Sequence, residues 1–359
     1  MDNNYTASVK QIIYRSFVKY DILQSLVYET FSNSSISEAT ELDIYIDLYS
    51  VLKPLFSEHS RTRIEDYTEL TSEIVNMCAH YRYFFRKLYV ATKFYLIWSY
   101  NINEINRKFV SGYNDIFYKK SQVKIFKEFV NNNMDLLEIL VPYLPDIFLI
   151  RSNKNYESSI IISALINKNN NAPSLIITHD TYPMQVTVYN RNTALLYPKK
   201  MSGRDESIMI PINEKSNFRH EFWRLLLDTN AIKVKEGLMD TISPLNYTLF
   251  CALNGMSNRN IKSMYSIIQS AKLLYYLTKG EDIKILPEHL YNDVEVVNSV
   301  PVSIVESRYN AIDINYIKPI YLQDPEYLSL KFDNLRDDSA VNHINAKFFA
   351  NNPIDINKL

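Results

Sequence analysis

Two acidic residues have the side-chain type and the positions to hold a metal ion. Glu157 lies in the first turn of a predicted helix, and Asp180 lies just past the strand-like run SLIIT. Open α/β sheets bind their ligands at the carboxyl ends of their strands, which is where both acids are expected. Carboxylate oxygens are the ligands that hard divalent cations prefer. Glu157 and Asp180 are therefore a candidate metal site.

Asp47 is a third acid in an unusual place, because it ends an otherwise apolar strand that reads IYI. A charge at the end of a buried strand is costly unless it is solvated, paired or bound to a cation. These three explanations stay open from the residues alone. For all three acids, capping or a salt bridge is the alternative to metal binding.

A strand–helix–strand unit between Leu144 and Asn190 positions Glu157 and Asp180. Its strands, DIFLI and SLIIT, are almost wholly apolar, which is typical of strands buried on both faces of a parallel sheet. Further buried strands are predicted at 44–48 and within TKFYLIWSY, with a long helix at 64–90 between them. Because crossovers between parallel strands are right-handed, the strand ends should meet at one edge. The predicted fold class is α/β with a mostly parallel central sheet, a helical N-terminal segment and a helical C-terminal region.

Four parts are predicted along the chain. They are a helical segment at 1–40, the α/β domain at 41–200, a helical region at 201–299 and a helical extension at 300–359. Within the α/β domain, the runs VTVYN and TALLYP lie between Val186 and Lys200 and predict a hairpin that extends the sheet.

A helix–turn–helix is predicted in the helical region, with its turn at Gly255–Ser257 and Ser257 as the N-cap of the second helix. The first turns of that helix carry Arg259 and Lys262. Free N–H groups and cations at a helix N-terminus suit a phosphate, so both residues are predicted to bind nucleic acid. The alternative is an αα-hairpin with an ordinary capped turn.

Basic and aromatic residues are interleaved in the segment that follows the second predicted strand. Its candidate nucleic-acid-binding residues are Arg107, Lys108, Tyr113, Lys119 and Lys120. Such a segment can hold a single strand, because cations neutralise phosphates and rings stack on bases. The alternative is an ordinary solvated helix face with a core stripe.

Composition excludes several function classes. Five glycines in 359 residues are far below the usual share of about 7%, and no GxGxxG or GxxxxGK[ST] loop occurs, so no nucleotide cofactor is expected. The net charge of −1 means that a local basic patch must hold any nucleic acid. Without a membrane-length apolar run or a signal-peptide core, a cytoplasmic protein with no membrane partner is expected. Abundant Asn, Ile, Lys and Tyr suggest an A/T-rich genome, such as many phages have.

The order of predicted elements resembles the 5′ nuclease superfamily of flap endonucleases and polymerase-associated 5′–3′ exonucleases, related more distantly to PIN-domain ribonucleases. IYIDLYSVL is similar to the family's first strand with its metal-binding Asp, YESSIIISALI to its acidic helix, and SLIITHDTYPMQV to its last acidic strand motif. NRKFVSGYN resembles the segment before the helical arch, and NYTLFCALNGMSNRNIKSM the entry to the helix-hairpin element.

This resemblance implies that Asp47, Glu157 and Asp180 are catalytic ligands of Mg²⁺ or Mn²⁺ and that the partner is single-stranded or flap DNA. The family's other acids are replaced here, by Trp98, Ser99 and Tyr100, by Ser158 or Ser159, by Tyr182, and by Ser257 and Asn258. Hydrolysis by two metals needs carboxylates that hold both ions about 4 Å apart. Three carboxylates can hold one ion, but would hold a second only weakly.

Two functions therefore stay open. The first is a metal-dependent 5′ nuclease that acts on DNA flaps or ends in replication or recombination, in the host cytoplasm if the source is viral. The second is a nuclease-fold protein that has lost catalysis, binds one ion or none, and serves as a nucleic-acid-binding or assembly subunit with a protein partner.

Overall fold

The computed structural model describes residues 41–52, 67–99, 104–112, 133–151, 157–168, 172–198, 208–213, 215–232, 242–264, 270 and 302–315. Three predictions fall outside these ranges. They are the helical segment at 1–40, the nucleic-acid-binding roles of Tyr113, Lys119 and Lys120, and most of the extension at 300–359.

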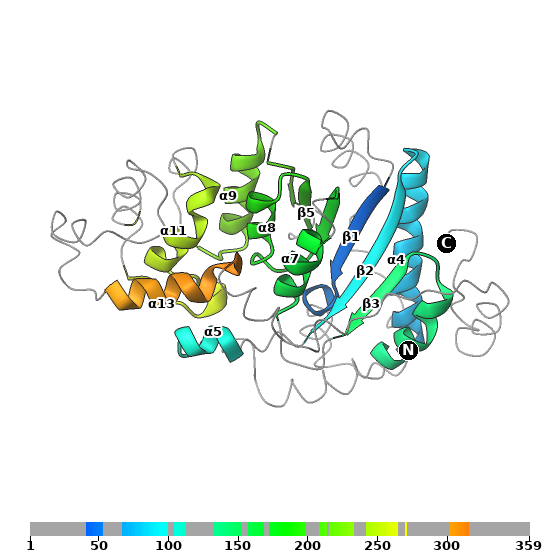
Figure 1. Cartoon of the computed structure of the whole chain (residues 1–359), viewed down its shortest axis with the longest axis horizontal. Helices are drawn as coiled ribbons and strands as arrows, with labels where there is room; N and C mark the ends of the chain where they lie inside the picture. The colour runs from blue at the N-terminus through cyan, green and yellow to red at the C-terminus, as the bar shows by residue number, and fades with distance from the viewer. Residues whose placement is uncertain are drawn as a thin grey trace, which may run out of the picture.

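One six-stranded sheet forms the centre of the described structure (Figure 1). Its strands are β1 (Glu41–Asp47), β2 (Ala91–Trp98), β3 (Ile147–Arg151), β4 (Ser174–Ile177), β5 (Thr193–Tyr197) and β6 (Ile208–Ile210). The order across the sheet is β3-β2-β1-β4-β5-β6, in which β6 pairs antiparallel with β5 and the other pairs are parallel. The predicted α/β class with a mostly parallel sheet is confirmed.

Helices cover both faces of the sheet, as expected for strands that are apolar on both faces. The main ones are α4 (Tyr67–Lys87), α7 (Ser158–Lys168), α8 (Met184–Tyr189) and α9 (Phe218–Asp228). α4 packs on one face, while α7, α8 and α9 contribute to the core on the other face (Figure 1). Residues 48–52 and 133–140 are also helical, and a 3₁₀ turn, η3 (Val141–Tyr143), precedes β3.

The alternation of side chains along β1 determines which face of the sheet Asp47 lies on. Ile44 and Ile46 belong to the core beneath α4, whereas Tyr45 belongs to the core beneath α7. Successive strand residues point to opposite faces, so Asp47 shares the face of Tyr45. The last side chain of β1 is therefore directed to the layer that contains α7.

The strand order creates a topological switch point between β1 and β4. The chain proceeds from β1 through β2 to β3 on one side, and then returns to place β4 on the other side of β1. In open α/β sheets the connections diverge at such a switch point, so a ligand site is expected at the carboxyl ends of β1 and β4.

The predicted hairpin between Val186 and Lys200 is wrong. Residues 184–189 form α8, and β5 pairs parallel with β4 instead of antiparallel with a preceding strand. α8 is thus the crossover helix of a further strand–helix–strand unit, β4–α8–β5. Five successive residues of α8 are buried, and a short buried helix cannot be distinguished from a buried strand by periodicity.

A second helical group adjoins the α7 face of the sheet (Figure 1). It contains α5 (Glu104–Phe109), η4 (Pro244–Asn246), α11 (Tyr247–Asn254), η5 (Ser257–Arg259) and α13 (Val302–Ile312). Asn106 of α5 donates to the carbonyl of Ala311 in α13 at 2.7 Å, and α13 packs on α11. Within the part of the chain that the structure describes, no helix combines the length and apolar character needed to cross a membrane.

Candidate functional site

The three predicted acids lie together at the carboxyl edge of the sheet. Asp47 is the last residue of β1, and the β1–β4 register pairs Ile46 with Ile177, so Asp47 lies beside Thr178. Asp180 follows two residues later. Glu157 precedes α7, where its carbonyl accepts the first helical hydrogen bond, from the amide of Ile160 at 2.9 Å. It therefore lies at the N-cap position, one residue before the helix in which it was predicted.

Hydroxyl and amide donors surround the buried Asp47 carboxylate. Its Oδ1 accepts hydrogen bonds from Ser158 Oγ at 2.8 Å and from the amide of Ser50 at 3.2 Å. Its Oδ2 accepts one from Thr178 Oγ1 at 3.0 Å. Burial and the neighbouring Asp180 raise the pKa of Asp47, against the lowering effect of the bonds from Ser158 and Ser50. Of the three explanations left open for Asp47, the structure shows pairing: hydrogen bonds from protein donors stabilise its carboxylate.

Ser158 and Thr178 were not predicted as site residues. Ser158 occupies one of the two positions where the family resemblance places a second helix acid, and its hydroxyl now donates to Asp47. Thr178 both donates to Asp47 and accepts the amide of Asp180 at 2.9 Å, so it links two of the acids. The sequence shows that position 158 lacks an acid. That the Ser158 hydroxyl donates to Asp47 could be seen only once the structure brought the two residues together.

Thr178→Val is expected to destabilise the protein by about 1–3 kcal/mol, because valine has the same shape but leaves Asp47 Oδ2 and the Asp180 amide without this partner. Thr178→Ser keeps the hydroxyl and should restore most of the loss. Chemical denaturation of the two variants and the parent would measure the difference. Equal stability of the valine variant and the parent would mean that the hydroxyl does not hold the cluster.

A buried arginine bridges the other two acids. Arg259 Nη2 lies 2.6 Å from Glu157 Oε1 and also pairs with the Asp180 carboxylate. The Arg259 guanidinium carbon is 5.1 Å from the centre of the Tyr182 ring, and the whole residue is 3% exposed. Burial raises the pKa of Glu157 to about 8, while Arg259 acts to lower it. One protein cation thus stands between two carboxylates at the switch point.

A tight turn carries Arg259 into the cluster. α11 ends before Gly255, whose φ is +82°, and Met256 and Ile261 form an antiparallel bridge that closes the turn. Asn258 Nδ2 donates to Thr181 Oγ1 at 2.7 Å, next to the acids. Asn260 then adopts a left-handed conformation with φ of 57°.

The prediction that Ser257 is an N-cap is wrong. Ser257 begins the 3₁₀ turn η5, and its hydroxyl donates to the carbonyls of Asn230 and Ala231. The prediction placed Arg259 at an exposed helix N-terminus for contact with a phosphate. The structure instead buries its guanidinium among carboxylates, because the turn rotates that side chain toward the sheet edge.

The acids, as they are arranged, do not fit a divalent cation. Asp47 already accepts three hydrogen bonds from the protein, and Glu157 and Asp180 are paired with Arg259. A second cation placed between them would lie beside a guanidinium and would be repelled by it. Among the residues that the structure describes, no group of three or more acids, histidines or cysteines is arranged to hold a metal. The expectation of Mg²⁺ or Mn²⁺ at these acids is therefore not supported by their geometry.

The remaining predicted nucleic-acid-binding residues lie on two neighbouring elements. Arg107 and Lys108 are in the last turn of α5, with Lys108 exposed, and Lys262 is exposed just after the turn that carries Arg259. Asn260 Nδ2 donates to the carbonyl of Gly112, beyond α5, at 2.9 Å. This bond joins the two elements, and α5 follows the carboxyl end of β2, so the three cations lie toward the same edge as the acids.

Comparison with known proteins gives structural likenesses at low sequence identity. No protein-family model matches the chain, and no curated protein sequence matches it. A zinc-bound 5′-exonuclease of bacteriophage T5 has a TM-score of 0.48 and 9% identity, with 80% of this chain and 95% of that chain covered. A flap endonuclease of bacteriophage T5 in complex with DNA and metal ions has a TM-score of 0.47 and 10% identity, with 86% and 98% covered. Human GEN1 in complex with Holliday junction DNA has a TM-score of 0.44 and 11% identity, with 88% and 70% covered.

Proposed function

We propose that this protein binds single-stranded or flap DNA without hydrolysing it. The observation that carries the proposal is the ion pairing of Arg259 with both Glu157 and Asp180. In this proposal Arg259 takes the place of a catalytic cation. A role as an end-binding or assembly subunit in DNA replication or recombination is consistent with such an activity.

Arginine can neutralise the acids but cannot perform the chemistry of a metal. A divalent ion binds a water molecule, lowers its pKa and yields a nucleophile near neutral pH. A guanidinium has only N–H donors and does not lose its proton in proteins, so it cannot coordinate or deprotonate water. With Arg259 between Glu157 and Asp180, the acidic site keeps its structure and lacks the means to activate water.

Binding is supported by the charges around the cluster. Pairing with Arg259 reduces the repulsion that Glu157 and Asp180 would exert on a phosphate backbone. Lys108 on α5 and Lys262 beyond η5 are exposed near this edge. Arg308 of α13 donates to the carbonyl of Lys262 at 2.8 Å, which fixes the backbone that presents this lysine. Such side chains position a phosphate backbone without reading its sequence.

Incubation with labelled flap and single-stranded DNA, in Mg²⁺ and separately in Mn²⁺, tests the proposal. We expect a retarded complex and intact DNA, both for the parent and for Asp180→Ala. DNA cleavage by the parent that the Asp180→Ala substitution abolishes would overturn the proposal and establish a metal-dependent nuclease. Absence of any complex at low salt would overturn the binding part.

Replacing Lys108 and Lys262 by alanine should weaken the salt dependence of DNA binding. On single strands the slope of log affinity against log salt concentration should shrink by about 0.7 for each lost phosphate contact, and so by about 1.4 for the double variant. Fluorescence anisotropy at several salt concentrations would give the slopes. A slope unchanged from that of the parent would remove both lysines from the DNA interface.

A further inference from the structure

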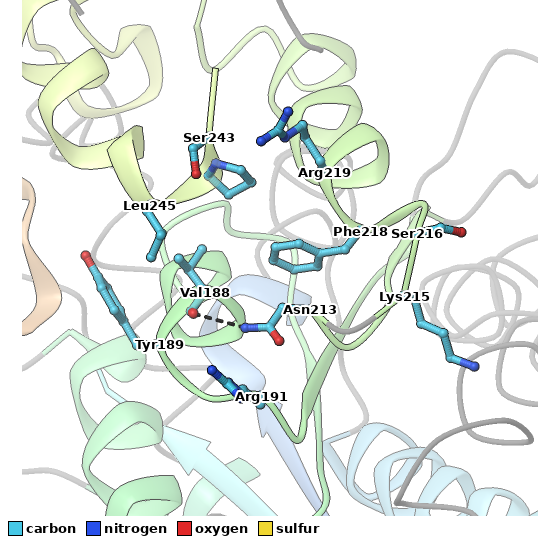
Figure 2. Close-up of a pocket in the computed structure, with 11 residues that line it drawn as sticks. Val188, Tyr189, Arg191, Asn213, Lys215, Ser216, Phe218, Arg219, Ser243 and Leu245 are labelled. Carbon is cyan, nitrogen blue, oxygen red and sulfur yellow. Dashed lines mark hydrogen bonds between the residues drawn. The ribbon is translucent and has the colours of Figure 1, made fainter. Parts of the chain in front are cut away.

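A cavity opens at the amino end of the sheet, at the edge opposite to the acids. α8 leads the chain from the end of β4 back to the start of β5, which brings Tyr189 and Arg191 to this edge. β6 runs antiparallel to β5, so the residues after Ile210 reach the same edge. Asn213 Nδ2 donates to the carbonyl of Val188 at 3.2 Å and joins these two segments (Figure 2).

The lining of this cavity is positively charged. Arg191, Lys215 and Arg219 line it, and no aspartate or glutamate occurs among the described residues that do so. Arg191 and Arg219 stand on opposite sides of Phe218 and Asn213 in Figure 2. The cavity volume is about 670 Å³. Sites for small molecules and cofactors usually measure about 300–1,000 Å³, so this cavity has the size and charge for one compact anion.

Apolar side chains make up much of the remaining lining. Tyr189 and Leu245 are 44% and 65% exposed, although both are large and apolar. Phe218, almost fully buried, lies between Arg191 and Arg219 in Figure 2. The Tyr189 ring belongs to the last residue of α8 and lines the cavity with Leu245 (Figure 2). An exposed aromatic ring beside cations is suited to stack on a nucleobase.

The first turn of α9 adds hydrogen-bond donors to the same cavity. Ser216, which precedes the helix, and Arg219 of its first turn line the cavity, and the Phe218 amide is bonded to the carbonyl of Lys215 at 3.0 Å. The first amides of a helix have no partner within the helix and favour an anion. Glu221, the acid of this turn, is paired with Arg224 at 3.5 Å. The positive end of the helix dipole therefore adds to the attraction that the cations exert on a phosphate.

We propose that this cavity is a nucleotide-binding site, with the base stacked on Tyr189 and the negative charge neutralised by Arg191, Lys215 and Arg219 from different sides of the cavity. The nucleotide is either free or part of a nucleic-acid strand, since both present the same chemistry. The exposed Tyr189 ring favours a nucleotide over an acidic peptide, because a peptide of acidic residues offers no base that could stack on it. The site shares no residue with the acid cluster, so it does not depend on the function proposed above.

Calorimetric titration of the full chain with deoxyadenosine monophosphate and with inorganic phosphate tests this site. Anisotropy of a short labelled oligothymidylate separates a strand from a free nucleotide as the source. The double variant Arg191→Gln/Arg219→Gln should bind the nucleotide at least about 10-fold more weakly. Tyr189→Leu should lose about 10-fold for the nucleotide and little for inorganic phosphate, because stacking is removed and the cations remain.

A matched control removes two cations elsewhere. Arg86→Gln/Lys87→Gln changes the same net charge at the exposed end of α4, on the other face of the sheet, and should leave nucleotide affinity unchanged. Equal losses in both double variants, or no loss in either, would overturn the proposal. Binding of an oligoglutamate peptide without binding of nucleotide would also overturn it and would indicate an acidic protein partner. Equal affinities for phosphate and nucleotide would overturn it as well and would indicate a plain anion site. Loss of flap-DNA binding in the Lys108/Lys262 variant would not affect these results.

Discussion

Replacing Arg259 by methionine is expected to destabilise the protein by about 3–5 kcal/mol, because removing one partner of a buried pair leaves an uncompensated charge. Here Glu157 and Asp180 lose the same arginine at once, although Glu157, with its pKa of about 8, carries only part of a charge near pH 7. Methionine keeps much of the length and apolar character of the arginine stem, so the effect reports mainly on charge. Unfolding by urea, followed by circular dichroism, would measure the change. A variant that unfolds during purification would agree with the expectation.

Arg308→Met is the matched control, since Arg308 is partly buried and donates to the carbonyls of Ala252 and Lys262. Its loss should cost about 1 kcal/mol, the usual value of such hydrogen bonds. Equal losses in the two variants would mean that Arg259 acts as an ordinary hydrogen-bond donor. Arg259→Lys should restore only part of the stability: an ammonium group can contact both carboxylates as Nη2 does, but it lacks the planar guanidinium that lies over the Tyr182 ring.

The effect of Mn²⁺ on the melting temperature of Arg259→Met provides a second test of the role of Arg259. If Arg259 stands where an ion would bind, Mn²⁺ should raise the melting temperature of Arg259→Met and leave that of the parent unchanged. An ion present at 100 times its Kd stabilises the folded state by about 2.7 kcal/mol. An equal rise in the parent would show that the ion displaces Arg259, and would contradict the proposal of a protein that does not hydrolyse DNA.

The convergence of Asp47, Glu157 and Asp180 could be predicted because it follows from local patterns. Asp47 and Asp180 end or follow apolar strands, Glu157 precedes the apolar helix after the third strand, and parallel strands place their carboxyl ends at one edge. The position of Arg259 could not be predicted in the same way. It depends on a turn in which one bridge, between Met256 and Ile261, replaces the start of a helix.

α8 shows a different limit of the sequence. Its residues VTV are β-branched and alternate in polarity, which favours a strand. The observed helix is only six residues long and is held by its burial between β5 and η4. Tertiary contacts determine both the position of Arg259 and the helical form of α8. The sequence therefore predicts the acids at the sheet edge, but not the elements that pack around them.

Gly255→Ala is expected to destabilise the protein by about 3 kcal/mol or more, through the turn that holds Arg259. Gly255 has φ +82° and ψ 168°, a region that other residues enter at a cost of about 1–3 kcal/mol. An added Cβ would also lie 2.6 Å from the carbonyl oxygen of Ile261 and from the amide nitrogen of Ser263. Both are backbone atoms, so the turn must move, and overpacking of this kind costs about 1–3 kcal/mol more.

Non-additivity would show whether this movement reaches the acids. If the alanine shifts Arg259 away from Glu157 and Asp180, Gly255→Ala/Arg259→Met should lose less stability than the two single variants together, because the ion pairs can be lost only once. Lys262→Ala, exposed in the same segment, should change stability by no more than about 0.5 kcal/mol. Strict additivity would mean that the turn and the ion pairs are independent. In that case Gly255 serves the local backbone and does not place the arginine.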